Sequence, residues 1–353
     1  MISPNFAFLN LTYACNNRCR WCYVSPADFK KDMMKPEDAK RYLKVCKSMK
    51  ISDIGFIGGE PTMHPDLFEL IRFTSHLGLK VSLYTNGRRL ADPEFIKELE
   101  KTGVHIVQFN IQSAERETHD EISRVCGSFE ETLKGIENWH KTGMNMRLLV
   151  VMCHKDFEIY QKMIDRFAHL KVMMVFFREI PPVDRDHDYN VLSNRDTAKL
   201  VERIFRYSKR KGVRAYFYLR MPLCWYDKTL AGQMLAENTF ANLCHITKGS
   251  SFSIDVEGNI LPCVYFVGYP MFGINEKGKI SSKDEILKKW NSIRIGKLRA
   301  KLRRTPNKEC TNCSQYGINC VGGCPLLKFE LGPYASEHQN PMVSASPGSS
   351  GRG

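Results

Sequence analysis

Residues 15–22 read Cys15-Asn16-Asn17-Arg18-Cys19-Arg20-Trp21-Cys22 and follow the short apolar run at residues 6–11. Cysteines at spacings of four and three, on a loop that leaves a strand, can point their sulfur atoms at one centre, as a soft metal ion or an iron–sulfur cluster requires. A closed structural zinc site normally has four ligands, whereas three thiolates leave a coordination position for a substrate or cofactor. The stretch therefore predicts a reactive metal centre, with a zinc knuckle or a chance grouping as alternatives.

The chain has 353 residues, which suits a barrel-sized catalytic domain plus one smaller domain. Its longest apolar runs, 148–153 and 172–177, are far shorter than the ~18 residues of a membrane span. We therefore expect no transmembrane helix. The N-terminus has no secretion-signal pattern, so we expect a cytoplasmic protein. In a reducing compartment, thirteen cysteines favour metal ligation over disulfides.

The net charge is +14, and its distribution matters more than its size. Residues 275–304 contain eleven Lys or Arg and three acidic residues, mostly on one predicted helix that includes Trp290, Ile293, Ile295, Leu298 and Leu302. This helix is interpreted either as a solvated basic face or as a surface for an acidic peptide or another anionic partner. Because no aromatic-rich basic groove is evident, we expect no nucleic-acid partner.

From residue 3 to about residue 177, short β-rich runs alternate with amphipathic segments of helix length, which is typical of a parallel sheet. Strands are predicted at 6–11, 54–57, 81–84, 106–110, 148–151 and 172–177. Helices are predicted at 36–50, 65–77, 93–102, 129–141 and 156–169, with Pro36, Pro65 and Pro93 in first turns. The expected fold is α/β, a partial (β/α)6 TIM-like barrel whose ligands sit at the carboxyl ends of the strands.

The second motif, Gly58-Gly59-Glu60-Pro61, directly follows the second predicted strand. Glycines lack a Cβ and let the backbone approach a ligand closely, and the proline fixes the next turn. Taken alone, this is an ordinary Gly-Gly turn. The third strand ends in the sequence of residues 84–87, Tyr-Thr-Asn-Gly, and the fourth in that of residues 110–113, Asn-Ile-Gln-Ser.

In combination, these motifs resemble the radical S-adenosylmethionine (radical SAM) family. The match rests on the C-x3-C-x2-C spacing of Cys15, Cys19 and Cys22, with aromatic residues on both sides of the last cysteine, and on the GGEP motif about 40 residues later. The resemblance implies that the three thiolates hold a [4Fe–4S] cluster whose fourth iron is chelated by S-adenosylmethionine (SAM). The cofactor-binding residues that it implies are Tyr23, Gly58, Gly59, Glu60, Pro61, Asn86, Asn110, Gln112 and Arg124.

Within this resemblance, the segment at residues 118–124 is similar to a family segment whose arginine pairs with the SAM carboxylate. We transfer that role to Arg124, for which a surface salt bridge is the alternative. Asn110 is transferred too, although relatives often have other residue types there. The loop at residues 181–188 leaves the sixth strand and is expected either to cover the substrate or to form a surface turn.

A second group of seven cysteines begins at Cys224. Cys244, Gly258 and Cys263 give a C-x13-G-x4-C pattern around a hairpin predicted at 251–255 and 259–262. Cys310, Cys313, Cys320 and Cys324 give C-x2-C-x6-C-x3-C, which alone is compatible with a zinc ribbon. Taken together with the motifs in the first half of the chain, the region resembles the SPASM extension of radical SAM maturases, which implies one or two auxiliary iron–sulfur clusters.

By the family pattern, Cys244, Cys263 and Cys324 bind one auxiliary cluster, and Cys310, Cys313 and Cys320 the other. This chain has no cysteine after Cys324, where relatives have one more. Cys224 could complete the first set, so that the second takes Glu330, Glu337 or His338 or keeps an open iron. The expected domains are a barrel at 1–220, a SPASM-like auxiliary domain at 221–331 and a flexible tail at 332–353.

The resemblance implies that one electron cleaves SAM to a 5′-deoxyadenosyl radical, which takes hydrogen from an unactivated carbon. A ribosomally synthesised peptide is the expected substrate, with oxidation, cross-linking or ring formation as the outcome. Possible partners are a separate leader-binding protein and a flavodoxin- or ferredoxin-type electron donor. A small-molecule (for example sugar) dehydrogenase or epimerase is the alternative within the family, and a non-enzymatic iron–sulfur electron carrier is the alternative outside it.

An epimerase needs a hydrogen donor, usually a thiol, opposite the abstracting radical. Cys153, just past the fifth strand, and Cys224 are the candidate catalytic donors. A buried core thiol is the alternative for Cys153, and a cluster ligand is the alternative for Cys224. We therefore expect an oxidising or bond-forming enzyme that loses two electrons per turnover through its auxiliary clusters.

Overall fold

The computed structural model describes residues 2–24, 33–178, 192–241, 243–276, 279–303, 310, 312–324 and 326. The predicted loop at 181–188, the candidate ligands Glu330, Glu337 and His338, and the predicted tail at 332–353 lie outside the described residues.

The described part of the chain forms one curved sheet of 11 strands in the order β11-β10-β9-β1-β2-β3-β4-β5-β6-β7-β8. Every neighbouring pair from β9 through β1 to β8 is parallel, and only β9–β10 and β10–β11 are antiparallel. The strands are β1 Phe6–Thr12, β2 Asp53–Gly58, β3 Lys80–Thr85, β4 Ile106–Asn110, β5 Met146–Met152, β6 Met173–Arg178, β7 Ala215–Tyr218, β8 Phe240–Ala241, β9 Ser251–Ile254, β10 Asn259–Leu261 and β11 Phe272–Gly273. A separate pair is formed by β12 Asn275–Glu276 and β13 Lys279–Ile280.

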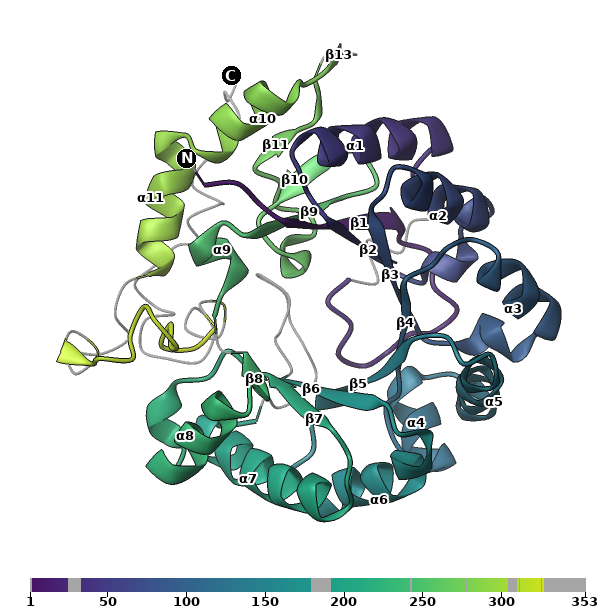
Figure 1. Cartoon of the computed structure of the whole chain (residues 1–353), viewed down its shortest axis with the longest axis vertical. Coiled ribbons are helices and arrows are strands. Elements are labelled where there is room, and N and C mark those ends of the chain that lie inside the picture. Colours follow the sequence, from purple (N-terminus) through teal and green to yellow (C-terminus); the bar gives the residue numbers. More distant parts are fainter. Residues whose placement is uncertain are drawn as a thin grey trace, which may run out of the picture.

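Helices cover the outer, convex face of this sheet (Figure 1). They are α1 Pro36–Ser48, α2 Leu67–His76, α3 Pro93–Glu100, α4 Arg116–Ser123, α5 Ser128–Lys141, α6 Phe157–Phe167, α7 Asn194–Arg210, α8 Lys228–Ala236, α9 His245–Lys248, α10 Lys283–Trp290 and α11 Ile293–Leu302. Short 3₁₀ helices lie at Pro61–Met63 (η2), Arg88–Ala91 (η3), Ala168–Leu170 (η4), Leu223–Trp225 (η5) and Val264–Phe266 (η6). The α/β fold with six predicted strands and five predicted helices is confirmed; four of these helices are a few residues shorter than predicted, and α5 begins one residue earlier.

The helix starts follow local chemistry. Pro36 and Pro93 occupy first helical positions, where their missing N–H costs nothing. The Asp92 carboxylate caps α3 by accepting from the Glu94 N–H at 3.0 Å. Pro65 was predicted to lie in a first helical turn, but it lies before α2. The chain makes one more turn there, in which the Leu67 N–H donates to the His64 carbonyl at 3.2 Å.

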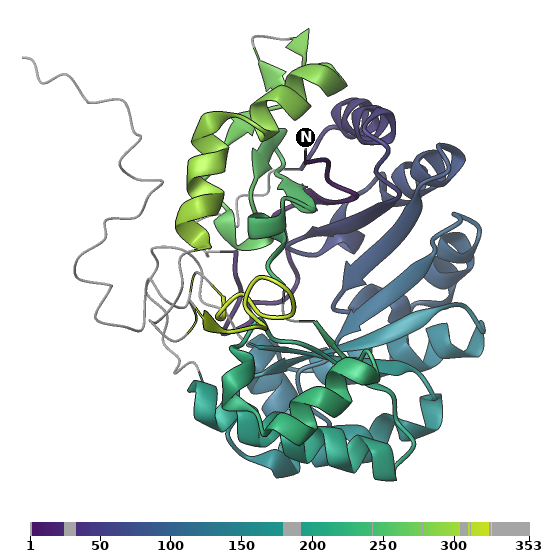
Figure 2. The same ribbon diagram turned by 60° about the vertical axis from the view of Figure 1, so that its left-hand side comes forward.

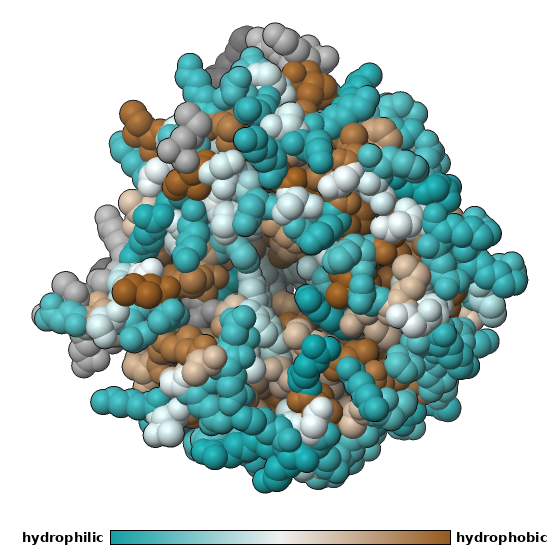
Figure 3. All heavy atoms as spheres, in the orientation of Figure 1, coloured by the Kyte–Doolittle hydropathy of each residue, from teal (hydrophilic) through white to brown (hydrophobic). Residues whose placement is uncertain are grey.

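The strands that form the inner layer carry the large apolar side chains. Phe56, Phe109 and Phe176 are fully buried, and Trp139 of α5 packs into the same core. Seen as spheres down the same axis, the molecule is hydrophilic over the outer helices and hollowed at the centre of the ring (Figure 3). In parallel α/β sheets of this kind, ligands bind at the carboxyl ends of the strands.

The cysteine-rich part of the chain shares the barrel's sheet. β9 pairs parallel to β1, with Phe6 opposite Ser251 and Leu9 opposite Ile254. The buried Asn10 side chain adds two bonds of 2.8 Å, from Nδ2 to the Ser253 hydroxyl and to the Ile254 carbonyl. The predicted hairpin is confirmed as β9 and β10. In the side view it lies beside β1, with α10 and α11 next to it (Figure 2).

The basic segment forms two helices, so the prediction of one helix through Trp290 and Leu302 is wrong. The chain breaks at Asn291, whose side chain bonds the backbone of Ile2 twice: Oδ1 accepts from the N–H at 2.8 Å and Nδ2 donates to the carbonyl at 2.9 Å. Ser292 then begins α11. In the part of the chain that the structure describes, no helix is long and apolar enough to cross a membrane.

Candidate active site

The loop of the first three cysteines leaves the carboxyl end of β1 and lies against the end of α4. The Arg18 and Arg20 N–H groups donate to the Ser123 and Ile122 carbonyls, both at 2.9 Å. Within the loop, the Cys22 N–H donates to the Cys19 carbonyl at 3.2 Å. The helix end therefore fixes the loop's backbone between its first and last thiol.

The three thiols lie close enough together to affect one another's ionisation. Burial, followed by the charge of Glu60, raises the pKa of Cys15 to about 12, and an N–H from Asn17 to its Sγ at 3.3 Å opposes this. Burial raises the pKa of Cys19 further, and the neighbouring Cys22 and Cys15 add to the effect. Without a bound cation, such thiols stay protonated. They become good ligands only when a positively charged centre replaces the protons.

This donor set fits an iron–sulfur cluster. A cluster binds each thiolate through a different iron atom, so its ligands stand further apart than those of a single ion. Among the described residues, no three His, Cys, Asp or Glu side chains are placed to hold one metal ion.

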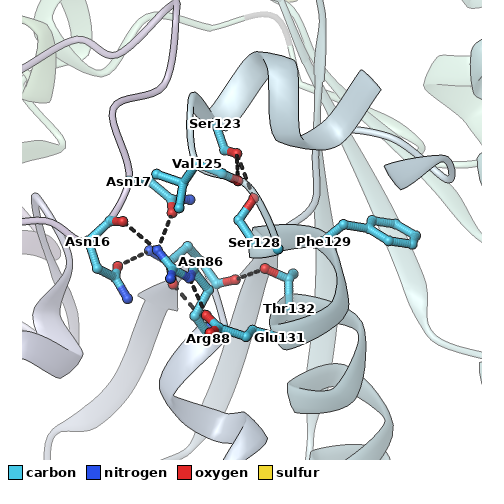
Figure 4. Close-up of polar contacts among 12 residues, drawn as sticks. Asn16, Asn17, Asn86, Arg88, Ser123, Val125, Ser128, Phe129, Glu131 and Thr132 are labelled. Atoms are coloured by element: carbon cyan, nitrogen blue, oxygen red, sulfur yellow. Dashed lines mark hydrogen bonds and ion pairs between the residues drawn. The ribbon is translucent and has the colours of Figure 1, made fainter. Parts of the chain in front are cut away.

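Arg88, on η3, holds the same loop from the other side (Figure 4). Its Nη1 donates to the Asn16 carbonyl and to the Asn17 Oδ1, the latter at 2.9 Å. Its Nε donates to the Glu131 carboxylate of α5 at 2.5 Å. The sequence analysis missed this residue. Its only sequence signal is that it directly follows Asn86-Gly87.

Asn86 joins the cysteine loop to the second motif, and Figure 4 shows it beside Asn16 of the loop and Thr132 of α5. Its Nδ2 donates to the Asn16 Oδ1 at 2.6 Å, and its N–H donates to the Glu60 Oε2 at 2.7 Å. Its carbonyl accepts from the Thr132 hydroxyl at 2.9 Å. A residue predicted to bind the cofactor therefore also connects three parts of the site.

The two glycines of the second motif allow β1 and β2 to meet. The Gly59 N–H donates to the Thr12 carbonyl at 2.7 Å, and the next N–H, of Glu60, donates to the Ala14 carbonyl at 2.8 Å. Gly58 has φ +139°, and a Cβ there would lie 2.1 Å from the Thr12 carbonyl oxygen. A Cβ on Gly59 would lie 2.4 Å from the Ala14 oxygen. In this structure, the close contact that requires glycine at positions 58 and 59 is with the backbone at the start of the cysteine loop.

Glu60 is buried and its carboxylate accepts four hydrogen bonds. Oε1 accepts from the Thr62 N–H at 3.1 Å, the Thr62 hydroxyl at 2.7 Å and the Thr85 hydroxyl at 2.7 Å, and Oε2 accepts from Asn86. Burial raises the pKa of Glu60, and these donors oppose the rise. Pro61 follows as the first residue of η2. Tyr23, after the last cysteine, donates to the Gly58 carbonyl at 3.1 Å.

The remaining predicted cofactor residues lie at β4 and α4. At the end of β4, the Gln112 Nε2 donates to the Asn110 Oδ1 at 3.1 Å, and the buried Gln112 Oε1 has no partner within the described chain. Arg124 ends α4 in the left-handed conformation, with φ 55°, and its side chain is exposed. The Asp120 carboxylate accepts from the N–H groups of Gly127 and Phe129, at 2.7 and 2.8 Å, which fixes the turn after Arg124.

The two candidate hydrogen donors follow different strands of the sheet. Cys153 follows β5 and is half-buried, and its N–H donates to the Tyr160 hydroxyl at 3.1 Å. Cys224 lies on η5 after β7 and is exposed.

Three of the seven C-terminal cysteines lie together. Cys244, Cys263 and Cys324 line one pocket with the buried Arg220 and with His245. Burial alone would lower the pKa of Arg220, but Tyr218 and these three thiols raise it above its usual value. Cys224, which could complete this group, lies on η5, and the segment that contains Cys320 and Cys324 packs on Pro222 just before it.

Comparison with known proteins agrees with this geometry. The radical SAM superfamily model matches residues 9–167. AdoMet-dependent heme synthase of Methanosarcina barkeri is 26% identical over 212 residues, 60% of this chain and 60% of that protein. A probable GTP 3′,8-cyclase of Saccharolobus islandicus is 25% identical over 265 residues, 73% of this chain and 82% of that protein.

Two solved structures share the fold over most of the chain. Streptococcus suis SuiB bound to the precursor peptide SuiA gives a TM-score of 0.72 at 17% identity, covering 97% of this chain and 75% of that one. The structure of anSMEcpe with bound AdoMet gives a TM-score of 0.69 at 19% identity, covering 91% and 89%.

The chain therefore contains a radical SAM domain, and the recognition and the fold predicted from its motifs are confirmed. More particularly, it is similar in fold to radical SAM proteins whose structures contain AdoMet or a precursor peptide. The superfamily implies SAM and a [4Fe–4S] cluster for this chain.

Proposed function

We propose that this chain is a radical SAM enzyme that modifies a ribosomally synthesised peptide by oxidation, cross-linking or ring formation. The observation that carries the proposal is the single network that joins the cysteine loop, Asn86 and Glu60 at the carboxyl ends of β1, β2 and β3. When reduced, the cluster supplies the electron that cleaves SAM to methionine and a 5′-deoxyadenosyl radical.

Each part of the chain has a role in this proposal. Cys15, Cys19 and Cys22 hold the cluster, and the end of α4 and Arg88 keep their loop in place. Gly59 and Glu60 receive the methionyl ammonium, for which the Glu60 Oε2 accepts only one bond from the described chain. Arg124 pairs with the SAM carboxylate. The C-terminal cysteines would hold the auxiliary clusters of a SPASM-like domain, which would accept the electron left by substrate oxidation, and a flavodoxin- or ferredoxin-type partner is the proposed electron donor.

The peptide substrate is supported by the likeness to SuiB, whose structure contains a precursor peptide. A small molecule is the second candidate, because the sequence relatives include a heme synthase and probable GTP cyclases. A leader-binding protein acting in trans belongs to the peptide proposal. The cytoplasm is the proposed location, as the reducing compartment that such clusters need.

The test begins with SAM cleavage. Replacing Cys15, Cys19 and Cys22 together by Ala should abolish 5′-deoxyadenosine formation and leave iron at the C-terminal cysteines, as measured by product chromatography and metal analysis. Arg124→Ala should weaken SAM binding by about 1.5–3 kcal/mol, as expected for a charged hydrogen bond. Unchanged 5′-deoxyadenosine formation by the triple variant would disprove the assignment of the cluster loop.

The substrate is tested by mass spectrometry of peptides encoded beside the gene, after incubation with enzyme, SAM and reductant. A product lighter by two hydrogens supports oxidation or ring formation. A product of unchanged mass that gains deuterium from heavy water, with activity lost in Cys153→Ala or Cys224→Ala, would instead show an epimerase.

A further inference from the structure

The spatial grouping of the seven C-terminal thiols differs from their order in the sequence. The segment that contains Cys320 and Cys324 packs directly on the segment after β7. A Cβ on Gly323 would lie 3.3 Å from the Pro222 Cδ and 3.6 Å from the Arg220 carbonyl oxygen. Pro222 directly precedes η5, which contains Cys224. This packing brings Cys224 to the segment that contains Cys320.

Cys310, Cys313 and Cys320 lie on one knuckle, whose backbone turns bring them together. The Cys313 N–H donates to the Cys310 carbonyl at 3.3 Å, and the Cys320 N–H donates to the Gln315 carbonyl at 3.0 Å. The Gly322 N–H donates to the Cys320 Sγ at 3.2 Å, a bond that stabilises a thiolate. Cys320 is buried in the same hydrophobic core as Leu223 and Tyr226, the neighbours of Cys224.

Cys310 and Cys313 lie on the same knuckle as Cys320, and the segment that contains Cys320 packs on the segment that leads into η5 and Cys224. Together these are four thiols, which is the number that closes an iron–sulfur site.

The other three thiols share a pocket with a buried cation. Arg220 is 9% exposed and has the left-handed φ of 47°. Its Nη2 donates to the Tyr218 hydroxyl at 2.9 Å, its guanidinium lies 4.6 Å from the centroid of that ring, and its Nε has no partner in the described chain. A buried cation needs a compensating negative charge. Cys244, Cys263 and Cys324 supply that charge if they are thiolates.

We propose that Cys224 closes a four-thiolate iron–sulfur site with Cys310, Cys313 and Cys320, and that Cys244, Cys263 and Cys324 form a separate three-thiolate site beside Arg220. This assignment rests on the auxiliary clusters of the proposed function. It places Cys224 with the second set of cysteines and not with the first, which the sequence had allowed it to complete. It also accounts for the missing cysteine after Cys324: the fourth thiol of the second site comes from η5, upstream in the chain.

The experiment uses the full chain with Cys15, Cys19 and Cys22 replaced by Ala, so that only C-terminal clusters contribute. In this background, Cys224→Ala and Cys313→Ala are compared with Cys263→Ala by iron content and by Mössbauer and electron paramagnetic resonance spectra. Cys126→Ala is the control, because Cys126 is exposed and belongs to neither group. Cys224 and Cys313 are exposed, so neither change removes core packing.

The expected result is that Cys224→Ala and Cys313→Ala perturb one and the same spectral component, and that combining them adds nothing. Cys263→Ala should perturb the other component, and combining it with Cys224→Ala should affect both. If Cys224→Ala instead perturbs the component that depends on Cys263, the grouping is overturned while the auxiliary clusters stand. If the background variant holds no iron, the auxiliary clusters of the proposed function fail as well.

Arg220 gives a second readout that does not depend on activity. Removing a cation beside a cluster makes its reduction harder, so Arg220→Gln should lower the potential of the component that depends on Cys263. The component that depends on Cys224 should keep its potential, and Arg206→Gln on the exposed face of α7 should change neither. A shift of the Cys224 component alone would contradict the placement of Arg220.

Discussion

Gly59 shows how one residue without a side chain determines the site. Its N–H reaches the Thr12 carbonyl, and the carbonyls of residues 13 and 14 would lie 2.6 and 2.4 Å from any Cβ placed there. The sequence predicted that a ligand requires this glycine. The structure adds a requirement from the protein's own backbone, which no sequence pattern distinguishes from the first.

We predict that Gly59→Ala displaces the start of the cysteine loop. Overpacking of this kind typically costs about 1–3 kcal/mol of folding free energy. Gly232→Ala is the matched control, because a Cβ there meets nothing within 4 Å and Ala favours a helix by ~1 kcal/mol. Chemical denaturation of both variants measures the difference. Equal stabilities would show that the loop moves aside without cost.

His119 predicts a dependence of stability on pH. It is buried, its Nδ1 accepts from the Gln112 N–H at 3.3 Å, and its Nε2 has no partner in the described chain. Burial lowers its pKa from 6.5 to about 4. Between these values the unfolded chain binds a proton that the folded chain does not, so stability is present above pH 6.5 and falls as the pH decreases toward 4.

The loss through His119 can reach about 3 kcal/mol, from a factor of about 1.4 kcal/mol per pKa unit. His119→Asn, whose amide oxygen can accept from Gln112, should flatten the curve of stability against pH between 6.5 and 4. His140→Gln, on the exposed side of α5, should leave the slope unchanged. An unaltered slope in His119→Asn would assign the acid loss to other groups.

At the scale of elements, α4 and η3 hold the cysteine loop between them. The end of α4 bonds the loop's backbone, and Arg88 of η3 bonds residues 16 and 17 while pairing with α5. α4 was not among the predicted helices, because its segment is polar and was recognised only as a motif. Helix-length amphipathic segments were predicted well, since their apolar faces pack on the sheet.

Arg88→Met should loosen the loop and speed iron loss to a chelator. The charged hydrogen bonds that it removes are each worth about 1.5–3 kcal/mol when shielded from water. Arg116→Met is the matched control, because Arg116 also pairs with a glutamate of α5, Glu130, but is 60% exposed. An exposed pair contributes about 0–1 kcal/mol. If both variants lose iron at the same rate, Arg88 does not support the loop.

At the scale of the whole molecule, the two predicted parts of the chain share one sheet. The order of strands along β1 to β6 followed from the repeated pattern of strand and helix. The pairing of β9 with β1 could not be predicted in this way. Nothing local in either strand specifies a partner more than 230 positions away, and this pairing depends on how the whole sheet closes. The neighbours of Cys224 could not be predicted from the sequence for the same reason.

We predict that β1 and β9 exchange their amide hydrogens as one unit. Strands that share hydrogen bonds open together, so residues 6–9 and 251–254 should show similar protection. Asn10→Ala, which removes two bonds to β9, should lower both together. The two-residue strand β11, at the sheet edge, should exchange faster. Much faster exchange of β9 than of β1 would indicate separable domains.

The pairing of β1 with β9 also has a consequence during synthesis of the chain. Ser251 is translated 245 residues after Phe6, its partner in the register, which takes roughly 10–50 s at ordinary rates of translation. Throughout that interval one edge of β1 has no strand beside it, and the thiols of residues 15, 19 and 22 are already made. A nascent chain of this protein therefore presents its first cysteines to the cell well before the strand that seals their support exists.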